Sequence, residues 1–290
     1  MPAAGRAALR RRVFRGSVAL EQGLLTRGEL RTKAWRRLRP DVYCDATLSL
    51  THRLQAKGVA LVAPPEAVFA GLTAAVLWGA GDLAGADDPV ELVLPAGVRW
   101  HPARGVVART ATVAGDVVTD GDLRWTSRTR TALDLIRRGP LDDAVVLLDQ
   151  LVQADVVELA AIRIAAAALP RCRGSRQARE AARLADGLAQ SPQETRLRLL
   201  IVRSELPMPV AQYRVTAHGR FVARVDFGYP ELRLAIEYEG LWHGEPQQVG
   251  PDRERLNRLL AAGWRVLFVT AADLWRPERL IARIAAAVAA

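Results

Sequence analysis

Cysteine is scarce in this sequence, which holds only two among its 290 residues. Cys44 and Cys172 lie far apart and belong to no Cys-x-x-Cys pattern, so we expect neither a disulfide framework nor a thiolate zinc site. Long apolar runs are also missing, because no window approaches an uninterrupted membrane span and no signal-type apolar stretch follows the arginine-rich N-terminus. These absences predict a cytoplasmic protein without a membrane partner.

Lysine is equally scarce, although the chain is strongly basic. Of its 41 basic residues only Lys33 and Lys57 are lysines, and the formal net charge is +10. A basic surface attracts polyanions because neutralising phosphates releases condensed counterions, so DNA is the leading partner class. An arginine excess beside abundant alanine is also what a GC-rich coding bias produces, and charge alone leaves that alternative open.

The size and composition of the chain predict more than one compact domain. Half of the residues are apolar, and a chain of this length exceeds the commonest size of a single domain. We expect the α/β class, in the sense of an α+β protein of two domains. The predicted segments are a winged-helix-like part over 1–60, an α/β region over 61–185 and a third segment over 191–290.

The first segment, 1–60, has the outline of a winged helix. Residues 23–30 carry a capping-box pattern that starts a short helix, and 40–44 read as a turn followed by a strand. Arg36 and Arg37 precede that turn and are the predicted contacts to nucleic acid in this segment. An ordinary helix-strand corner with solvated arginines explains the same pattern, because the spacing barely allows the further helix of a helix-turn-helix.

The middle segment, 61–185, continues the alternation of helices and strands. The pattern predicts a helix over 67–80, a strand over 90–95 and a helix starting in 126–135. Residues 141–159 have apolar positions at helical spacing, and we expect Asp142, Asp143 and Asp149 to form its solvated face.

Three short stretches of these two segments carry a resemblance. Gly23–Thr26, Arg39–Tyr43 and Arg130–Leu135 resemble the AbiEi-type antitoxin region that often precedes nuclease-like domains in actinobacterial proteins. The resemblance implies that this region begins with a DNA-binding winged helix.

The third segment opens with a strong helix start. Ser191 is a typical cap, Pro192 suits the first turn, and Glu194 stands at the third helical position, from which it can reach back to the cap. A helix should run over 192–204, with Glu194 near the edge of its apolar face. Completing the capping box is as good an explanation of Glu194 as a catalytic role.

Two strands after this helix carry a group of acids. The sequence predicts an antiparallel meander with strands over 212–217, 220–227 and 232–238. Asp226 lies in the second strand, and period two places Glu237 and Glu239 on one face of the third. Acids that approach closely repel one another unless a cation joins them, and an all-oxygen site suits Mg²⁺ or Mn²⁺. A solvated surface remains the ordinary explanation of isolated acids on strands.

The residues that follow the meander make the pattern recognisable. It continues with Gly240-Leu241-Trp242-His243, with Asp252-Arg253-Glu254-Arg255 in a helix over 251–262, and with Gly263-Trp264-Arg265-Val266 before a closing helix over 277–287. Together with Glu194, Asp226 and Glu237, this series resembles the restriction-endonuclease-like domain, of the PD-(D/E)XK superfamily, that is related to the very-short-patch repair endonucleases.

The resemblance implies a fold, a site and an activity. The fold is an αβββαβ core with a mixed sheet flanked by helices, and the activity is Mg²⁺-dependent hydrolysis of phosphodiester bonds in DNA. Asp226 and Glu237 would be metal ligands, Glu194 a water-mediated ligand, and His243 a catalytic group near the reacting oxygens. The site also takes in Glu239 as a catalytic carboxylate, Asp252 as structural support, and Arg253 and Arg255 as nucleic-acid-binding residues.

Two departures from that family keep a rival function open. The wider superfamily often has lysine where this chain has Glu239, and neither Lys33 nor Lys57 lies in this segment. Where aspartate is usual instead, glutamate is longer by one methylene, which exceeds the tolerance of a metal site. The rival is a catalytically inactive nuclease fold that binds DNA as a regulator or antitoxin-like protein. The sequence indicates no small-molecule cofactor and no oligomeric state.

Overall fold

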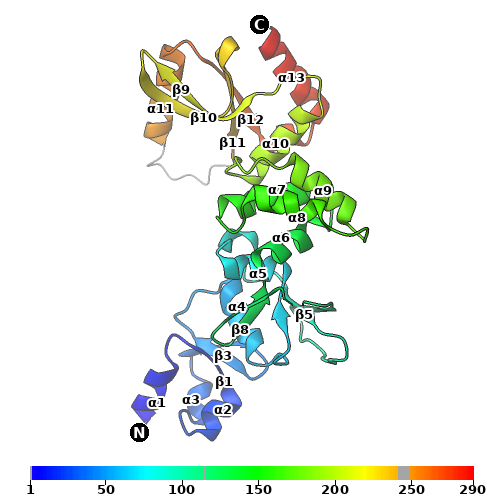
Figure 1. Cartoon of the computed structure of the whole chain (residues 1–290). Helices are drawn as coiled ribbons and strands as arrows, with labels where there is room; N and C mark the ends of the chain where they lie inside the picture. The colour runs from blue at the N-terminus through cyan, green and yellow to red at the C-terminus, as the bar shows by residue number, and fades with distance from the viewer. Residues whose placement is uncertain (1, 114, 241–248) are drawn as a thin grey trace. The chain divides into compact units, whose positions relative to one another are not determined.

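The computed structural model describes the backbone of residues 2–113, 115–240 and 249–290, and the side chains of 6–113, 115–240 and 253–290. The chain divides into two compact units, Met1–Arg137 with Ala154–Leu169 and Arg138–Gln153 with Pro170–Ala290. The described residues contain both helices and strands, and the strands form three sheets (Figure 1). This confirms the mixed α/β class. Within the same residues, no helix is both long and apolar enough to cross a membrane.

Unit 1 begins with a small sheet and three short helices. The elements are α1 (Pro2–Leu9), β1 (Val13–Arg15), α2 (Gly16–Glu21), α3 (Arg27–Leu30), β2 (Trp35–Arg39) and β3 (Val42–Asp45), and the strand order is β1-β3-β2. Thr26 caps α3 through the predicted capping box with Glu29. The elements follow the order helix, strand, helix, helix, strand, strand, and α2 is a helix that the sequence pattern does not predict. The winged-helix-like part over 1–60 stays a prediction. Phe14 and Trp35 pack edge to face in the core of this part, with ring centroids 5.1 Å apart.

The rest of unit 1 is a five-stranded sheet with helices. Its strands are β4 (Val68–Phe69), β5 (Val90–Leu94), β6 (Val106–Thr110), β7 (Val117–Asp120) and β8 (Leu123–Thr126), in the order β6-β5-β4-β8-β7. Its helices are α4 (His52–Ala60), α5 (Gly71–Trp78), the 3-10 turn η1 (Gly81–Leu83), α6 (Arg128–Ile136) and α8 (Leu159–Ala167). The helix predicted over 67–80 therefore starts late, because Val68 and Phe69 pair with β5.

From Pro192 onward, unit 2 contains the predicted helices and strands in their predicted order, with one further short α-helix, α12, before the last. The elements of the whole unit are α7 (Leu141–Gln153), α9 (Ser175–Leu184), α10 (Pro192–Val202), β9 (Val210–Ala217), β10 (Arg220–Tyr229), η2 (Pro230–Leu232), β11 (Leu234–Glu239), α11 (Val249–Ala261), β12 (Arg265–Thr270), α12 (Ala271–Leu274) and α13 (Pro277–Ala289). The sheet order is β12-β11-β10-β9, with β12 parallel to β11 and the other pairs antiparallel. From α10 to β12 the order is thus αβββαβ around a mixed sheet.

Helices cover both faces of this sheet (Figure 1). On one face Leu197 of α10 and Leu280 of α13 pack with Ile236 of the sheet, and on the other Leu259 of α11 packs with Val225. Apolar burial of this kind is the main stabilising contribution to such a layer. Polar residues of β9, β10 and β11 line the candidate site.

One sequence expectation about unit 2 is wrong. The helical pattern predicts a solvated position for Asp149, but its side chain is fully buried. One of its oxygens accepts from the amides of Asp186 and Gly187, and the other accepts from Thr195 and Arg198 of α10. These bonds tie α7 to α10, which is why α7 belongs to the same compact unit as the C-terminal segment. The three-way division at 60, 185 and 191 stays a prediction.

Candidate active site

Hydrogen bonds fix Glu194 at the start of α10. Its amide donates to Ser191 Oγ at 3.2 Å, and its Oε1 accepts from the same hydroxyl at 2.9 Å. The second oxygen, Oε2, accepts from the Gln190 amide and from Gln212 Nε2 of β9, each at 2.9 Å. The carboxylate therefore completes the cap and is also drawn toward the sheet.

Asp226 and Glu237 lie opposite each other on neighbouring strands. The β10–β11 ladder pairs Phe227 with Ile236, so Asp226 and Glu237 are each the next residue along, and antiparallel pairing brings them side by side. Asp226 Oδ2 accepts from the Tyr238 amide at 2.8 Å. The predicted approach of these two acids is thus a consequence of strand register.

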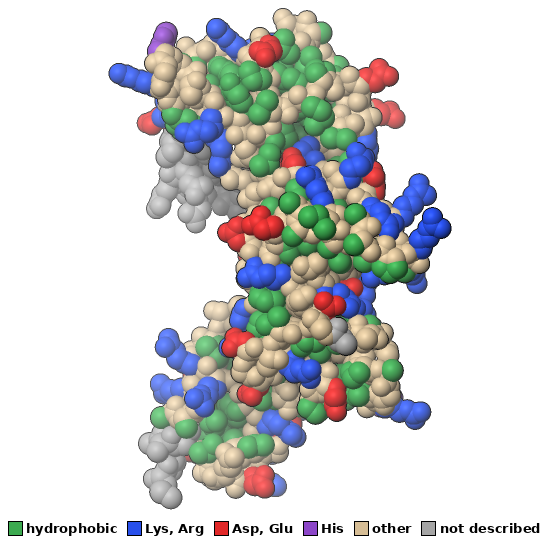
Figure 2. Space-filling model, viewed as in Figure 1, with side chains coloured by type: hydrophobic (Ala, Val, Ile, Leu, Met, Phe, Trp, Pro, Cys, Tyr) green, Lys and Arg blue, Asp and Glu red, His purple; other side chains and the backbone are tan. Residues whose placement is uncertain are grey.

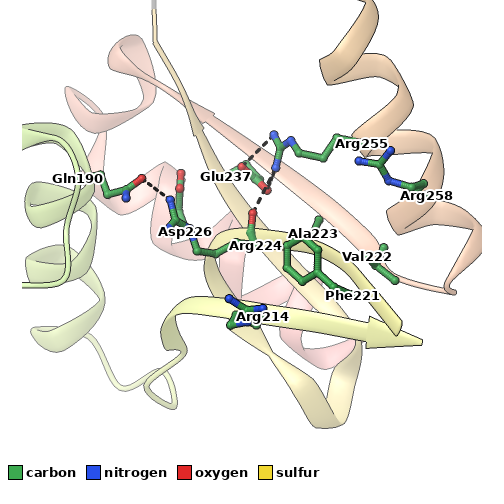
Figure 3. A pocket seen from close by; sticks show the side chains of 10 residues that line it. All are labelled: Gln190, Arg214, Phe221, Val222, Ala223, Arg224, Asp226, Glu237, Arg255 and Arg258. Atoms are coloured by element: carbon green, nitrogen blue, oxygen red, sulfur yellow. Dashed lines mark hydrogen bonds and ion pairs between the residues drawn. The ribbon is translucent and has the colours of Figure 1, made fainter. Parts of the chain in front are cut away.

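The two acids open into a pocket of about 500 Å³, drawn in Figure 3. Its walls combine two acids, one amide, four arginines, one aromatic ring and two aliphatic side chains. They are Gln190, Arg214, Phe221, Val222, Ala223, Arg224, Asp226, Glu237, Arg255 and Arg258. Four arginines around two carboxylates form a site that attracts anions while keeping acids at its base.

Arg255 of α11 forms a two-pronged ion pair with Glu237. Its Nη1 lies 2.7 Å from Oε1 and its Nη2 lies 3.3 Å from Oε2. Such bidentate pairing fixes the orientation of the carboxylate as well as neutralising it. The sequence predicts contact with nucleic acid for Arg255, and the pair gives it a direct connection to the acids.

All three acids are less acidic than they would be in water. Burial raises the pKa of Glu194, and the nearby Asp226 carboxylate raises it further. Burial also raises the pKa of Asp226. For Glu237, burial raises the pKa against the opposing effect of Arg255, and Asp226 and Glu194 add repulsion. Asp226 and Glu194 thus lie close enough to Glu237 to repel its charge, and negative charge there is unfavourable without a cation.

The structure places the remaining predicted residues differently. Glu239 is exposed at the end of β11 and does not line the pocket, and Arg253 is exposed on α11. His243 and the side chain of Asp252 lie outside the described residues. Among the described residues, no group of three or more histidine, cysteine, aspartate or glutamate side chains is arranged to hold a metal ion.

The two arginines predicted in the winged-helix-like part also differ from each other. Arg36 donates to the carbonyl oxygens of Ala46 and Leu48, each at 3.1 Å, and thereby holds the chain that follows β3. Arg37 is exposed. The hairpin β2–β3 therefore presents Arg37 to solvent and uses Arg36 within the fold.

Sequence reasoning missed several residues of the site. Gln212 has a positive φ of 51° in β9, a backbone state that costs free energy for a residue other than glycine, and it bonds Glu194. Arg224 donates to Gln190 Oε1 at 2.8 Å. A polar side chain inside a strand was the only available signal, because both contacts join residues distant in sequence.

Removing the charge of Asp226 should stabilise the metal-free protein. The folded-state pKa of Asp226 is raised, so its contribution is fully present below the unfolded pKa and is lost as pH rises through the folded pKa. In EDTA, the free energy of unfolding of Asp226→Asn is expected to match that of the wild type near pH 4. At pH 7 it should be larger by about 1 kcal/mol, a usual gain when a destabilising functional residue is replaced. Urea unfolding at both pH values measures this. Glu231→Gln, an exposed acid of the same unit, should show no such pH-dependent gain; a gain of equal size there contradicts the assignment.

Comparison with known proteins identifies two relatives. The uncharacterized proteins Rv2248 and MT2308, from two strains of Mycobacterium tuberculosis, are each 34% identical to this chain over 201 residues, covering 67% of it and 72% of the relative. No protein-family profile matches. The crystal structure of the RV2827C protein from the same species aligns with a TM-score of 0.40 and 16% identity, over 74% of this chain and 86% of that one, too low a likeness to support a conclusion. The chain belongs to the family of Rv2248 and MT2308.

Proposed function

We propose that unit 2 is a metal-dependent endonuclease domain that hydrolyses phosphodiester bonds in DNA. The observation that carries this proposal is the pocket in which Asp226 and Glu237 lie together among four arginines, with Glu194 close enough to raise the pKa of Glu237. Phosphate and a divalent cation are the partners that neutralise such a mixed site. The αβββαβ order supports assigning the domain to the PD-(D/E)XK superfamily, near the very-short-patch repair endonucleases.

The residues present suit Mg²⁺ or Mn²⁺. Asp226, Glu237 and Glu194 offer only oxygen donors, which these cations prefer. Burial raises the pKa of all three, so a bound cation would offset the cost of their negative charge. Asp226 and Glu237 would hold the ion, with Glu194 acting through a water. When bound, the ion lowers the pKa of a water and stabilises charge on the phosphoryl group.

The arginines supply the positive charge that binds phosphate. Arg224 and Arg258 line the same pocket and can bind the phosphates on either side of the bond to be cut. Arg255 holds Glu237 in one orientation. Arg255 takes one contact at each carboxylate oxygen, and each oxygen keeps a second lone pair that a cation could use.

We propose that unit 1 adds affinity for DNA through the β2–β3 hairpin. Basic side chains are scattered over the visible face of both units (Figure 2), so net charge alone does not locate the contact. The exposed Arg37 is the strongest choice because Arg36 is engaged in the fold. We also propose a cytoplasmic location for such a protein, as its scarcity of cysteine indicates.

Replacing Arg37 tests the hairpin. Arg37→Ala is expected to weaken duplex DNA binding and to lower the slope of log affinity against log salt by about 1, the loss of one phosphate contact. Fluorescence anisotropy in EDTA at several salt concentrations measures both quantities. Arg279→Ala removes the same charge from an exposed position on α13 and should change the slope little. Equal effects of the two variants would show that the hairpin has no special role.

Cleavage by the wild-type chain tests the nuclease itself. Supercoiled plasmid and single-stranded DNA are incubated with pure protein in Mg²⁺, in Mn²⁺ and in EDTA. The proposal predicts cleavage with either metal and none in EDTA. An absence of cleavage under every metal condition would contradict it.

The Arg255–Glu237 ion pair favours one alternative, an inactive nuclease fold that binds DNA as a regulator or antitoxin-like protein. An arginine already compensates the charge that a cation would otherwise compensate. This alternative predicts salt-dependent DNA binding that survives removal of the acids, with no cleavage at all. The plasmid assay separates it from the endonuclease.

A further inference from the structure

Phe221 occupies an unusual position at the end of the β9–β10 hairpin. It is 56% exposed, although phenylalanine in a strand is normally turned into the core. The guanidinium of Arg214, on the neighbouring strand, lies 4.9 Å from the centroid of its ring. A cation–π contact at that distance is favourable and keeps the ring in place at the surface.

A β-bulge directs the ring toward this side of the hairpin. Arg224 pairs with Arg214 and Ala223 with Val215, and after the register shift Phe221 pairs with Thr216. Because side chains alternate along β9, Thr216 shares a face with Arg214 and not with the buried Val215. Phe221 therefore lies on the arginine face. Bulges commonly re-aim one side chain in this way next to functional sites.

The same pocket connects the ring to the acids. Phe221 and Arg214 line it together with Arg224, Asp226 and Glu237, as Figure 3 shows. Its volume of about 500 Å³ lies in the range of pockets that take one small molecule. A single nucleotide is a ligand of the size that such pockets take.

We propose that Phe221, backed by Arg214, is a stacking platform for a nucleobase in a single-stranded stretch of nucleic acid. The proposal rests on the proposed nuclease function and names its substrate class. Aromatic rings beside cationic side chains bind single strands because every base has a π-face, whereas bases in a duplex are already stacked. With the base on Phe221, the adjoining phosphate lies toward Arg224 and the acid pair.

Binding to short oligonucleotides tests the platform without any cleavage. Fluorescein-labelled oligo(dT), oligo(U) and a DNA duplex of the same length are titrated with the full-length protein in EDTA. Phe221→Ala is expected to weaken binding of at least one single strand by about 5- to 100-fold, the size of one stacking contact, and to change duplex binding less than twofold. Phe221→Trp should keep single-strand binding close to that of the wild type, because tryptophan also offers an aromatic face. The fluorescence of its added indole should be quenched by the oligonucleotide.

A matched variant separates this effect from general loss of apolar surface. Trp275→Ala removes an aromatic side chain that is 87% exposed in the same unit and should leave single-strand binding unchanged. Equal weakening of single-strand and duplex binding by Phe221→Ala, or no weakening, would overturn the platform. Failure to cut DNA would remove the nuclease and leave this binding result standing, so the two proposals fail separately.

Discussion

Glu237→Gln is expected to reduce metal-dependent DNA cleavage on the order of 1000-fold. The substitution keeps the size of the side chain but removes the charge that would hold the cation, which contributes several kcal/mol to stabilising phosphoryl transfer. The substitution also removes the ion pair between Glu237 and Arg255. The measurement is the initial rate of plasmid nicking in Mg²⁺, with circular dichroism to show that the variant is folded.

An acid of matched charge provides the control. Glu231→Gln removes an exposed carboxylate in the short turn between β10 and β11 and should cut DNA at nearly the wild-type rate. The account is contradicted if Glu237→Gln is folded and cleaves as fast as Glu231→Gln. Such a result would assign the cleavage to other residues.

Arg198→Ala is expected to have the largest effect on stability, a loss of about 3–5 kcal/mol. Its guanidinium donates to the fully buried Asp149 at 2.8 Å and to the carbonyl oxygen of Leu184 at 2.6 Å. Removing it leaves the Asp149 carboxylate buried without its cation, and an uncompensated buried charge is far costlier than a lost contact. Urea unfolding followed by circular dichroism measures the change.

The comparison is with Arg196→Ala on the same helix. Arg196 pairs with Asp143 at 2.6 Å, but the two side chains are 44% and 45% exposed, and ion pairs at such positions contribute about 0–1 kcal/mol. The two variants therefore remove the same residue type from one helix at different depths. Similar losses of stability would contradict the central position of Asp149 in the packing of α7 against α10.

Local patterns predict the elements of unit 2 well. The cap at Ser191 and the alternation around Asp226 indicate α10 and the meander, because capping and strand periodicity depend on residues close in sequence. The third strand is predicted only slightly early, over 232–238 in place of Leu234–Glu239. The prediction of a capping box at Thr26 is confirmed for the same reason, because the box joins residues only three positions apart.

Contacts between distant residues could not be predicted in this way. The pairing of Arg255 with Glu237 depends on where α11 crosses the sheet, and the burial of Asp149 depends on α10, a helix that begins well beyond it in the sequence. Helical spacing places Asp149 on a face of α7 but does not say whether another helix covers that face. The α2 helix was missed because its six residues are too few to show a period.

Direct measurement of metal binding tests the central claim, that Asp226 and Glu237 hold a divalent cation. Mn²⁺ is titrated into the wild-type chain and into the double variant Asp226→Asn, Glu237→Gln, and bound ion is followed by electron paramagnetic resonance. The account predicts one Mn²⁺ bound at these acids in the wild type and its loss in the double variant. Equal Mn²⁺ binding by both proteins, or none by the wild type, would contradict it.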